Sequence, residues 1–178
     1  MELSIRCIDM RFDLFEKMSA VEAVDVLNDF LGTGKCYEAD LGLDVDYSLS
    51  KLPTILEDLT TKLTSTPTQE DLSLPEFIRN TEDYKVGLYE FTPEAKRIII
   101  GAAYHFGECF LRLHSRLKWG VGKVGYATGN MPVVVGFDKG KELPVLLVLE
   151  NLFSRRIENP DIPDVFQTAI EKWMRNVS

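Results

Sequence analysis

Three side chains close together on one predicted helix are of types that do chemistry: His105, Glu108 and Cys109. His105 and Cys109 are four positions apart, a spacing at which one helix face can hold a metal ion. The chain has only 2 histidines, and His114 is nine positions from His105, on the opposite side of such a helix. We therefore expect no metal site and no cofactor, and we interpret this stretch as a polar helix edge beside a buried thiol.

The same helix edge supplies the candidate binding residues. Glu108 and Arg112 are four positions apart, in the orientation that favours an ion pair along a helix. Trp119 follows the helix by a few residues, so its ring is expected to pack against it. His105, Glu108, Arg112 and Trp119 are the candidate binding residues. No nucleophile with an adjacent base is evident, so no catalytic residue is predicted.

Two other motifs have the letters of a ligand site without its context. Asp40, Asp44 and Asp46 alternate with apolar residues, whereas a calcium loop needs a central glycine and a later glutamate. Gly120-x-Gly122-x-x-Gly125 matches a dinucleotide fingerprint, but the residues after it favour a strand, not the helix that would receive the phosphates. We interpret the first motif as a strand with an acidic outer face and the second as a turn-rich connection.

The helix that carries these residues has a clear beginning. Thr92 is a good N-cap, Pro93 suits the first helical position, and Glu94 favours the positive end of the helix dipole. Apolar residues then recur at helical spacing over most of the circumference, which is typical of a buried helix. Gly101 and Gly107 lower helix propensity, and close packing of another element would explain their presence. The apolar positions are Ala95, Ile98, Ile99, Ala102, Ala103, Phe106, Phe110 and Leu113.

Strands are expected after this helix. Residues 132–137 and 143–149 are apolar runs joined by Asp138–Lys139–Gly140–Lys141, which predicts an antiparallel hairpin with Trp119 on or beside a third strand. We expect the Trp119 ring to be buried and its indole N–H to donate to a backbone carbonyl, with the Glu108 carboxylate as the second candidate. Replacing a buried tryptophan by alanine costs about 3–5 kcal/mol.

The other elements are predicted as follows. Residues 3–14 fit a strand with a bulge or a helix about equally well. Ser19 and Glu22 form a capping box that opens a helix, and Gly32 and Gly34 are expected to stop it. Residues 41–47 alternate as a half-buried strand. Further predictions are a helix with Pro53 in its first turn, an exposed loop over 64–75, a short helix over 76–79, and a terminal helix from Pro163 and Asp164 with an apolar stripe.

Together these elements predict an α+β fold. We expect an antiparallel sheet of about three to five strands packed against a long central helix, with additional N- and C-terminal helices. The 178 residues suit a single domain over 1–178, with 64–83 as a loop-rich connection.

Charge and cysteine content limit the partners and the compartment. The net charge is −8, and residues 1–94 carry 20 acidic against 8 basic side chains. Nucleic acid is not expected as a partner, because phosphate binding needs concentrated positive charge. A basic protein partner fits better. No run of apolar residues is long enough for a membrane span, the first residues lack the pattern of a signal peptide, and 3 widely spaced cysteines favour reduced thiols in the cytoplasm.

Two blocks of the chain, 41–57 and 103–112 followed by Trp119, 132–135 and Pro144, resemble small bacterial domains of unknown function. In such domains a glycine–glutamate pair on the central helix precedes a tryptophan strand and a hairpin. Gly107, Glu108 and Trp119 are the positions that match. The resemblance implies an α+β fold and no established activity.

The sequence supports two functional hypotheses. The first is a non-enzymatic cytoplasmic binding protein, such as the inhibitor of a basic toxin or nuclease, because the first half is acidic and no catalytic pair is evident. The second is a small-molecule sensor or enzyme with a pocket between the central helix and the Gly120–Gly125 loop, beside Trp119, His105 and Glu108.

Overall fold

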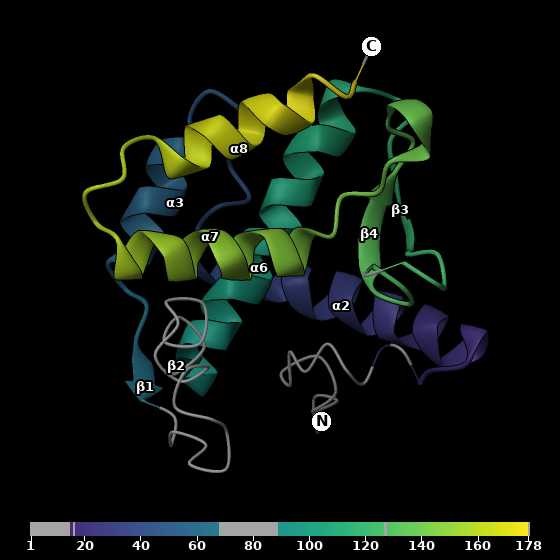
Figure 1. Cartoon of the computed structure of the whole chain (residues 1–178), viewed down its shortest axis with the longest axis horizontal. Helices are drawn as coiled ribbons and strands as arrows, with labels where there is room; N and C mark the ends of the chain where they lie inside the picture. The colour runs from purple at the N-terminus through teal and green to yellow at the C-terminus, as the bar shows by residue number, and fades with distance from the viewer. Residues whose placement is uncertain (1–14, 16, 68–88, 127, 178) are drawn as a thin grey trace, which may run out of the picture.

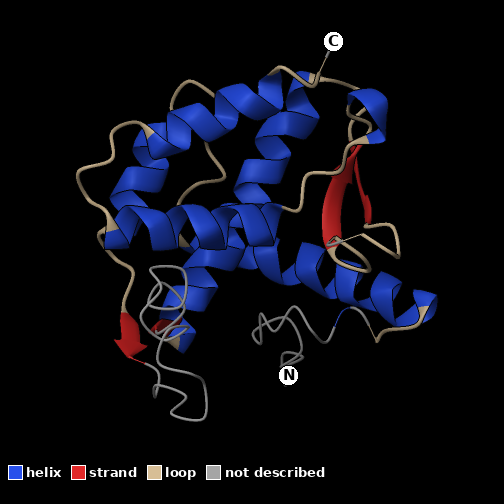
Figure 2. Ribbon diagram, viewed as in Figure 1, coloured by secondary structure: helices blue, strands red, loops and turns tan. Residues whose placement is uncertain are grey.

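The computed structural model describes residues 15, 17–67, 89–126 and 128–177. Helices dominate this part of the chain, and the strands are short (Figure 2). The helices are α2 (Ala20–Asp40), α3 (Leu52–Thr60), α6 (Pro93–Leu113), α7 (Val145–Glu158) and α8 (Val165–Met174), with a short 3₁₀ helix η2 (Asp138–Gly140). The strands are β1 (Ser65–Pro67), β2 (Tyr89–Phe91), β3 (Lys118–Val121) and β4 (Pro132–Val135).

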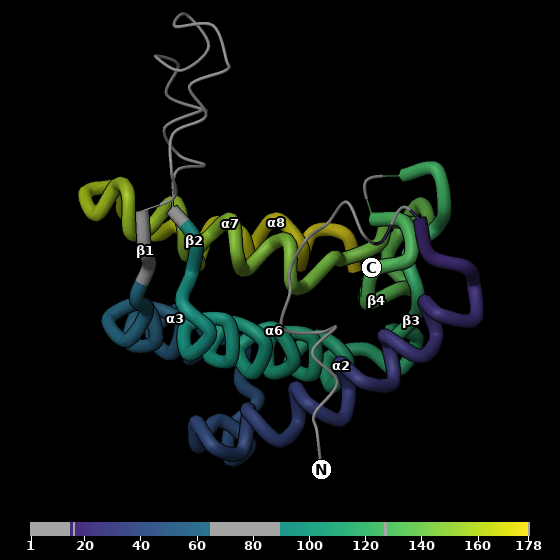
Figure 3. Tube along the Cα trace, turned by 90° about the horizontal axis from the view of Figure 1, so that it is seen from below, coloured from purple at the N-terminus to yellow at the C-terminus, as the bar shows by residue number. Residues whose placement is uncertain are grey.

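The helix predicted from Thr92 is α6, and its start is confirmed. The Thr92 hydroxyl accepts a hydrogen bond from the Ala95 amide, and Pro93 occupies the first turn. Twelve of its 21 residues are buried, including Ile99, Ala103 and Phe106. Figures 1 and 3 show why: α2 crosses α6 on one side, and α7 and α8 lie on the other. α6 therefore supplies 8 of the 24 buried residues of the main core.

The mixed α and β character is confirmed, but the predicted sheet of three to five strands is not found in the described residues. Instead β1 pairs with β2 and β3 pairs with β4, each pair antiparallel and separate. Trp119 lies on β3 opposite Val134, so the strand predicted at Trp119 is confirmed.

The strand predicted over 143–149 is wrong. Only Leu143 bridges to Val134, and α7 begins at Val145, directly after Pro144. A short run that is apolar at every position has no period that separates a buried strand from a buried helix. Helical structure continues from Val145 to Glu158, so the apolar residues of the run pack against α6 as one face of a helix and not as a strand.

In the first half of the chain the predicted helix end at Gly32 and Gly34 and the predicted strand over 41–47 are also wrong. Gly32 and Gly34 do not stop a helix; α2 continues through both to Asp40, and residues 41–47 form turns and coil in place of a strand. A Cβ at position 34 would lie only 2.7 Å from the Tyr104 Cβ. At Gly101 it would lie 3.0 Å from the Tyr37 carbonyl carbon. These two glycines let the backbones of α2 and α6 cross closely.

Other local predictions are confirmed. Ser19 and Glu22 form the capping box of α2, Pro53 lies in the first turn of α3, and α8 begins directly after Asp164. Phe166 and Ile170 of α8 are buried in the core. The loop predicted over 64–75 is wrong at its start, where β1 (Ser65–Pro67) pairs with β2. The rest of that loop and the predictions for residues 3–14 and 76–79 fall outside the described residues.

A second small core joins the start of α2 to β4. Phe15 and Val26 pack with Met131 and Val133. The buried Asn130 side chain donates hydrogen bonds to the carbonyl oxygens of Phe15 (2.8 Å) and Met18 (3.1 Å). Asn130 thus links two segments 115 positions apart in the sequence.

Candidate functional site

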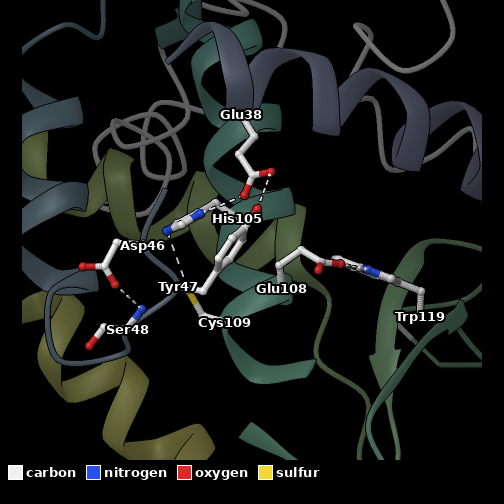
Figure 4. A network of polar contacts seen from close by, with 8 residues as sticks. All are labelled: Glu38, Asp46, Tyr47, Ser48, His105, Glu108, Cys109 and Trp119. Carbon is white, nitrogen blue, oxygen red and sulfur yellow. Dashed lines mark hydrogen bonds and ion pairs between the residues drawn. The ribbon is translucent and has the colours of Figure 1, made fainter. Parts of the chain in front are cut away.

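Three of the four predicted binding residues project from α6 in different directions. His105 points into the contact with α2, and Glu108 points toward β3 (Figure 4). Arg112 is exposed and lies over Tyr47, in the loop that follows α2. The predicted ion pair between Glu108 and Arg112 is not among the ion pairs of the described residues. Each side chain has a different partner instead: Glu108 binds Trp119, and Arg112 lies over Tyr47.

His105 is held by a glutamate from α2. Its Nδ1 lies 2.8 Å from Glu38 Oε1, and both side chains are at most 2 % exposed. A carboxylate oxygen accepts, so the imidazole donates from Nδ1, and its Nε2 lies on the side away from Glu38. Glu38 reaches this place because α2 runs past Gly34 and brings its last turn onto α6.

Cys109 lies at the other end of the imidazole. Its Sγ is 3.6 Å from His105 Nε2, and the residue is 2 % exposed. Burial, reinforced by the nearby Glu38 carboxylate, raises the pKa of the Cys109 thiol to about 12. The thiol is therefore protonated at neutral pH, and its sulfur faces His105 Nε2.

Tyr47 closes this network on the side of the loop after α2. Its hydroxyl donates to Glu38 Oε2 at 3.2 Å, and its ring lies 5.1 Å from the His105 ring. Burial, with the Glu38 charge, raises the pKa of Tyr47 to about 12, so the hydroxyl remains a donor. The guanidinium carbon of Arg112 is 3.4 Å from the centre of the Tyr47 ring, a cation–π contact that covers the network from outside.

Trp119 packs against α6 as expected, with one correction about its hydrogen bond. The indole N–H donates to Glu108 Oε1 at 2.8 Å, the acceptor we ranked second. A Cβ at position 107 would lie 2.1 Å from the ring, so only glycine leaves room for it. The ring stacks on Tyr104 at 5.9 Å and meets Phe30 edge-on at 5.5 Å. Trp119 as a whole is half-buried, less than predicted.

The order of groups Cys109–His105–Glu38 is that of a thiol nucleophile, its base and the residue that orients the base. Two observations argue against such chemistry in this conformation. The sulfur is not reachable from solvent, and a thiol with a pKa of about 12 supplies almost no thiolate. The network is best explained as a set of buried hydrogen bonds that stabilises the contact between α2 and α6.

The remaining motifs do not assemble a ligand site. No three potential metal ligands come together within the described part of the chain. Asp46 pairs with Lys51 and accepts from the Ser48 amide, so it stabilises a turn. Gly122 is required sterically, because a Cβ there would lie 1.9 Å from the Thr128 carbonyl oxygen. None of the helices in the described ranges has the length and apolarity needed to span a bilayer.

Glu38 and Tyr47 were missed as members of this site. Their positions are 67 and 58 residues before His105, so no local spacing connects them with it. One signal was available: Phe30, Gly34 and Tyr37 continue the buried helical face of α2 past Gly32. Extending that helix would have placed Glu38 beside Tyr37 at the crossing.

No protein-family model matches this chain, and no significant similarity to a curated protein or to a solved structure was found. The resemblance to small bacterial domains therefore stays a prediction from the sequence. Any functional proposal has to come from the surface and the sites of this chain.

Proposed function

We propose that this protein binds a basic protein partner and acts as its inhibitor in the cytoplasm, without enzymatic activity of its own. The observation that carries the proposal is a stripe of acidic side chains on the outer face of α2. Asp25, Asp29 and Asp40 fall within about 60° of one another around the helix axis. Asp44 follows in the next turn, and Val21 beside the stripe is 72 % exposed.

Within the described residues these carboxylates are not neutralised by a basic side chain. No ion pair of the described residues includes Asp25, Asp29, Asp40 or Asp44. Across residues 19–46 Lys35 is the only basic residue. An unpaired acidic stripe with an exposed aliphatic side chain suits a partner whose surface presents lysines or arginines around an apolar centre. Such charge complementarity would accelerate association at low ionic strength.

The test is capture of a partner from the native host with immobilised wild-type protein and with Asp25→Asn/Asp29→Asn/Asp40→Asn. We expect the wild type to retain a basic protein in a stoichiometric amount at low salt, and the triple variant to lose it. Asp58→Asn/Asp161→Asn/Asp164→Asn removes the same charge from other exposed positions and should retain the partner. Absence of a stoichiometric partner, or equal retention by both triple variants, would contradict the proposal.

The second hypothesis, a small-molecule pocket beside His105, Glu108 and Trp119, has less support. His105 is 1 % exposed, and the Trp119 ring fills the space over Gly107. Two hollows are found among the described residues, one beside η2 and α8 and one between α7 and α8. Neither is lined by any of these three residues. It stays a prediction, and a ligand screen by thermal shift tests it.

A further inference from the structure

A separate hollow of about 460 Å³ lies between the β3–β4 connection, the segment around η2 and α8. This volume is in the range of small-molecule sites. None of the candidate binding residues His105, Glu108, Arg112 and Trp119 lines this hollow. Its lining consists of Lys123, Tyr126, Thr128, Lys139, Gly140, Lys141, Glu142 and Trp173.

A single carboxylate holds two walls of this hollow together. Glu142 Oε2 accepts from the Lys123 amide at 3.1 Å and from the Thr128 hydroxyl at 2.9 Å. The Glu142 side chain is only 9 % exposed, so its carboxylate is largely sheltered from water. The β3–β4 connection is thereby fixed to the η2 segment, and the hollow is formed before any ligand arrives.

The hollow is positively charged in a protein whose net charge is −8. Three lysines line it against the one carboxylate of Glu142. Lys123 Nζ lies 3.8 Å from Glu142 Oε1, and Lys141 Nζ donates to Asn176 Oδ1 at 2.5 Å, a neutral partner that leaves its charge uncompensated. Lys139 is in none of the ion pairs of the described residues. The balance of the lining is +2.

Lys139 also has a left-handed backbone, with φ 56° and ψ 24°. This conformation is uncommon for residues with a side chain, and glycine adopts it more easily. The next residue, Gly140, also has a positive φ and is a glycine, as such a backbone conformation favours. A lysine kept at a strained position at the rim of a hollow is explained if its ammonium group has a task there.

Two aromatic rings complete the lining. Trp173 of α8 is held in place by an edge-on contact with Phe137 at 5.3 Å between ring centres. Tyr126 is 70 % exposed, so its ring is accessible from solvent. Lysine ammonium groups bind phosphate as point charges, and exposed rings stack on flat heterocycles.

We propose that this hollow binds a small phosphorylated molecule with an aromatic ring, the chemistry of a nucleotide: Lys123, Lys139 and Lys141 receive the phosphates, and Trp173 with Tyr126 receives the ring. The site goes beyond the proposed function, and it uses no residue of the acidic stripe. Loss of partner binding and loss of nucleotide binding are therefore separable.

The experiment follows the indole N–H signals in ¹H–¹⁵N spectra of the full chain during titration with ADP. The chain has 2 tryptophans, so Trp173 in the hollow reports binding and Trp119 serves as the internal control. Trp173→Phe assigns the two signals. We expect ADP to shift the Trp173 signal saturably and to leave that of Trp119 in place. Adenosine has the ring without the phosphates, and inorganic pyrophosphate has the phosphates without the ring. Both are expected to bind more weakly than ADP.

Lysine variants test the charges. Lys139→Met/Lys141→Met should weaken ADP binding about tenfold, whereas Lys62→Met/Lys118→Met, which removes two exposed charges elsewhere, should not. Lys139→Gly separates the site from the fold: it relieves the left-handed strain, so the melting temperature should rise while ADP affinity falls.

Three results would overturn the proposal. One is an unchanged Trp173 signal at millimolar ADP and low salt. Another is equal weakening by the two double variants, which would mean that only overall charge matters. The third is pyrophosphate binding as tightly as ADP, which would exclude recognition of the ring.

Discussion

Two carboxylates lie at opposite contacts of α6, and only one of them is well partnered. Glu38, from α2, accepts hydrogen bonds from His105 and Tyr47 and is 1 % exposed. Glu150, from α7, has a buried Oε2 without a hydrogen-bond partner among the described residues. Burial raises the pKa of Glu150 to about 7, and only Lys96 opposes this. The same residue type therefore fastens one helix to α6 and weakens the attachment of another.

This difference shows that burial alone does not predict what a carboxylate does for stability. An acceptor with two donors offsets the cost of leaving water, whereas an oxygen without a donor does not. The contact of α2 with α6 is therefore expected to be intolerant of changes at its polar centre. The contact of α7 with α6 is expected to improve when its charge is removed.

The largest effect is expected from Glu38→Ala. It leaves the His105 N–H and the Tyr47 hydroxyl without their acceptor in a buried place, at a cost of about 3–5 kcal/mol. Urea unfolding followed by circular dichroism measures it. Glu38→Gln keeps a carbonyl acceptor and should lose clearly less. A loss below about 1 kcal/mol for the alanine variant would show that the network adds nothing to the crossing.

Trp119→Ala is expected to cost about 3 kcal/mol, the low end for a large aromatic, because the residue is only half-buried. The ring contacts at Gly107, Tyr104 and Phe30 would all be lost. Thermal unfolding measures the loss. Nearly unchanged melting together with loss of a partner or ligand would mean that Trp119 is a binding residue and that its structural role was misjudged.

Glu150→Gln is expected to stabilise the protein at high pH only. Folded Glu150 titrates near 7 and the unfolded residue near 4.5, so the folded state holds the proton more tightly. The stability gained from the protonated form is complete below pH 4.5 and is lost as the pH rises to 7. The glutamine variant should therefore exceed the wild type by about 2 kcal/mol at pH 8 and by little at pH 4.

Melting curves of both proteins across pH 4–8 measure this difference. Lys96→Met serves as the opposite control, since it removes the one charge that lowers the Glu150 pKa and should shift the pH dependence upward. A gap between Glu150→Gln and the wild type that is the same at both pH values would contradict the explanation by protonation.

The smallest effect is expected from Glu108→Gln. The amide oxygen can still accept from the Trp119 indole, and the pair is partly exposed, so only about 0.5–1 kcal/mol should be lost. The same change at Glu38 should cost more, because water cannot replace the lost charge there. Equal effects at the two positions, measured by urea unfolding, would remove the distinction between a buried and a half-exposed carboxylate.

Local signals in the sequence predict the parts of this fold that depend on near neighbours. Ser19 with Glu22, and Thr92 with Pro93, act within one turn of helix, so both helix starts could be identified. Gly101 and Gly107 correctly indicated close packing, although not which element packs there. Trp119 was correctly placed on a strand against α6.

The rest depends on contacts between distant residues. The Glu38–His105 pair and the Tyr104 ring beside Gly34 bring together positions about 70 apart, and no spacing along the chain announces them. Glu108 was expected to be the second candidate acceptor for the Trp119 indole because it lies on the polar side of α6. The β3–β4 hairpin brings the indole to that polar side. The helix α7 was missed because an unbroken apolar run is equally compatible with a buried strand.

The link from Asn130 to Phe15 has a consequence for how the chain folds during its synthesis. α2 is made early, yet its start is fixed by a side chain 115 positions later and its end by His105, 67 positions after Glu38. At about 5–20 residues per second, roughly 6 to 23 s separate the synthesis of Phe15 from that of Asn130. Throughout that interval Val26, which packs with Met131 and Val133 in the finished protein, lacks the residues that cover it. A nascent chain stalled before residue 130 is thus the form of this protein that a chaperone on the ribosome would recognise.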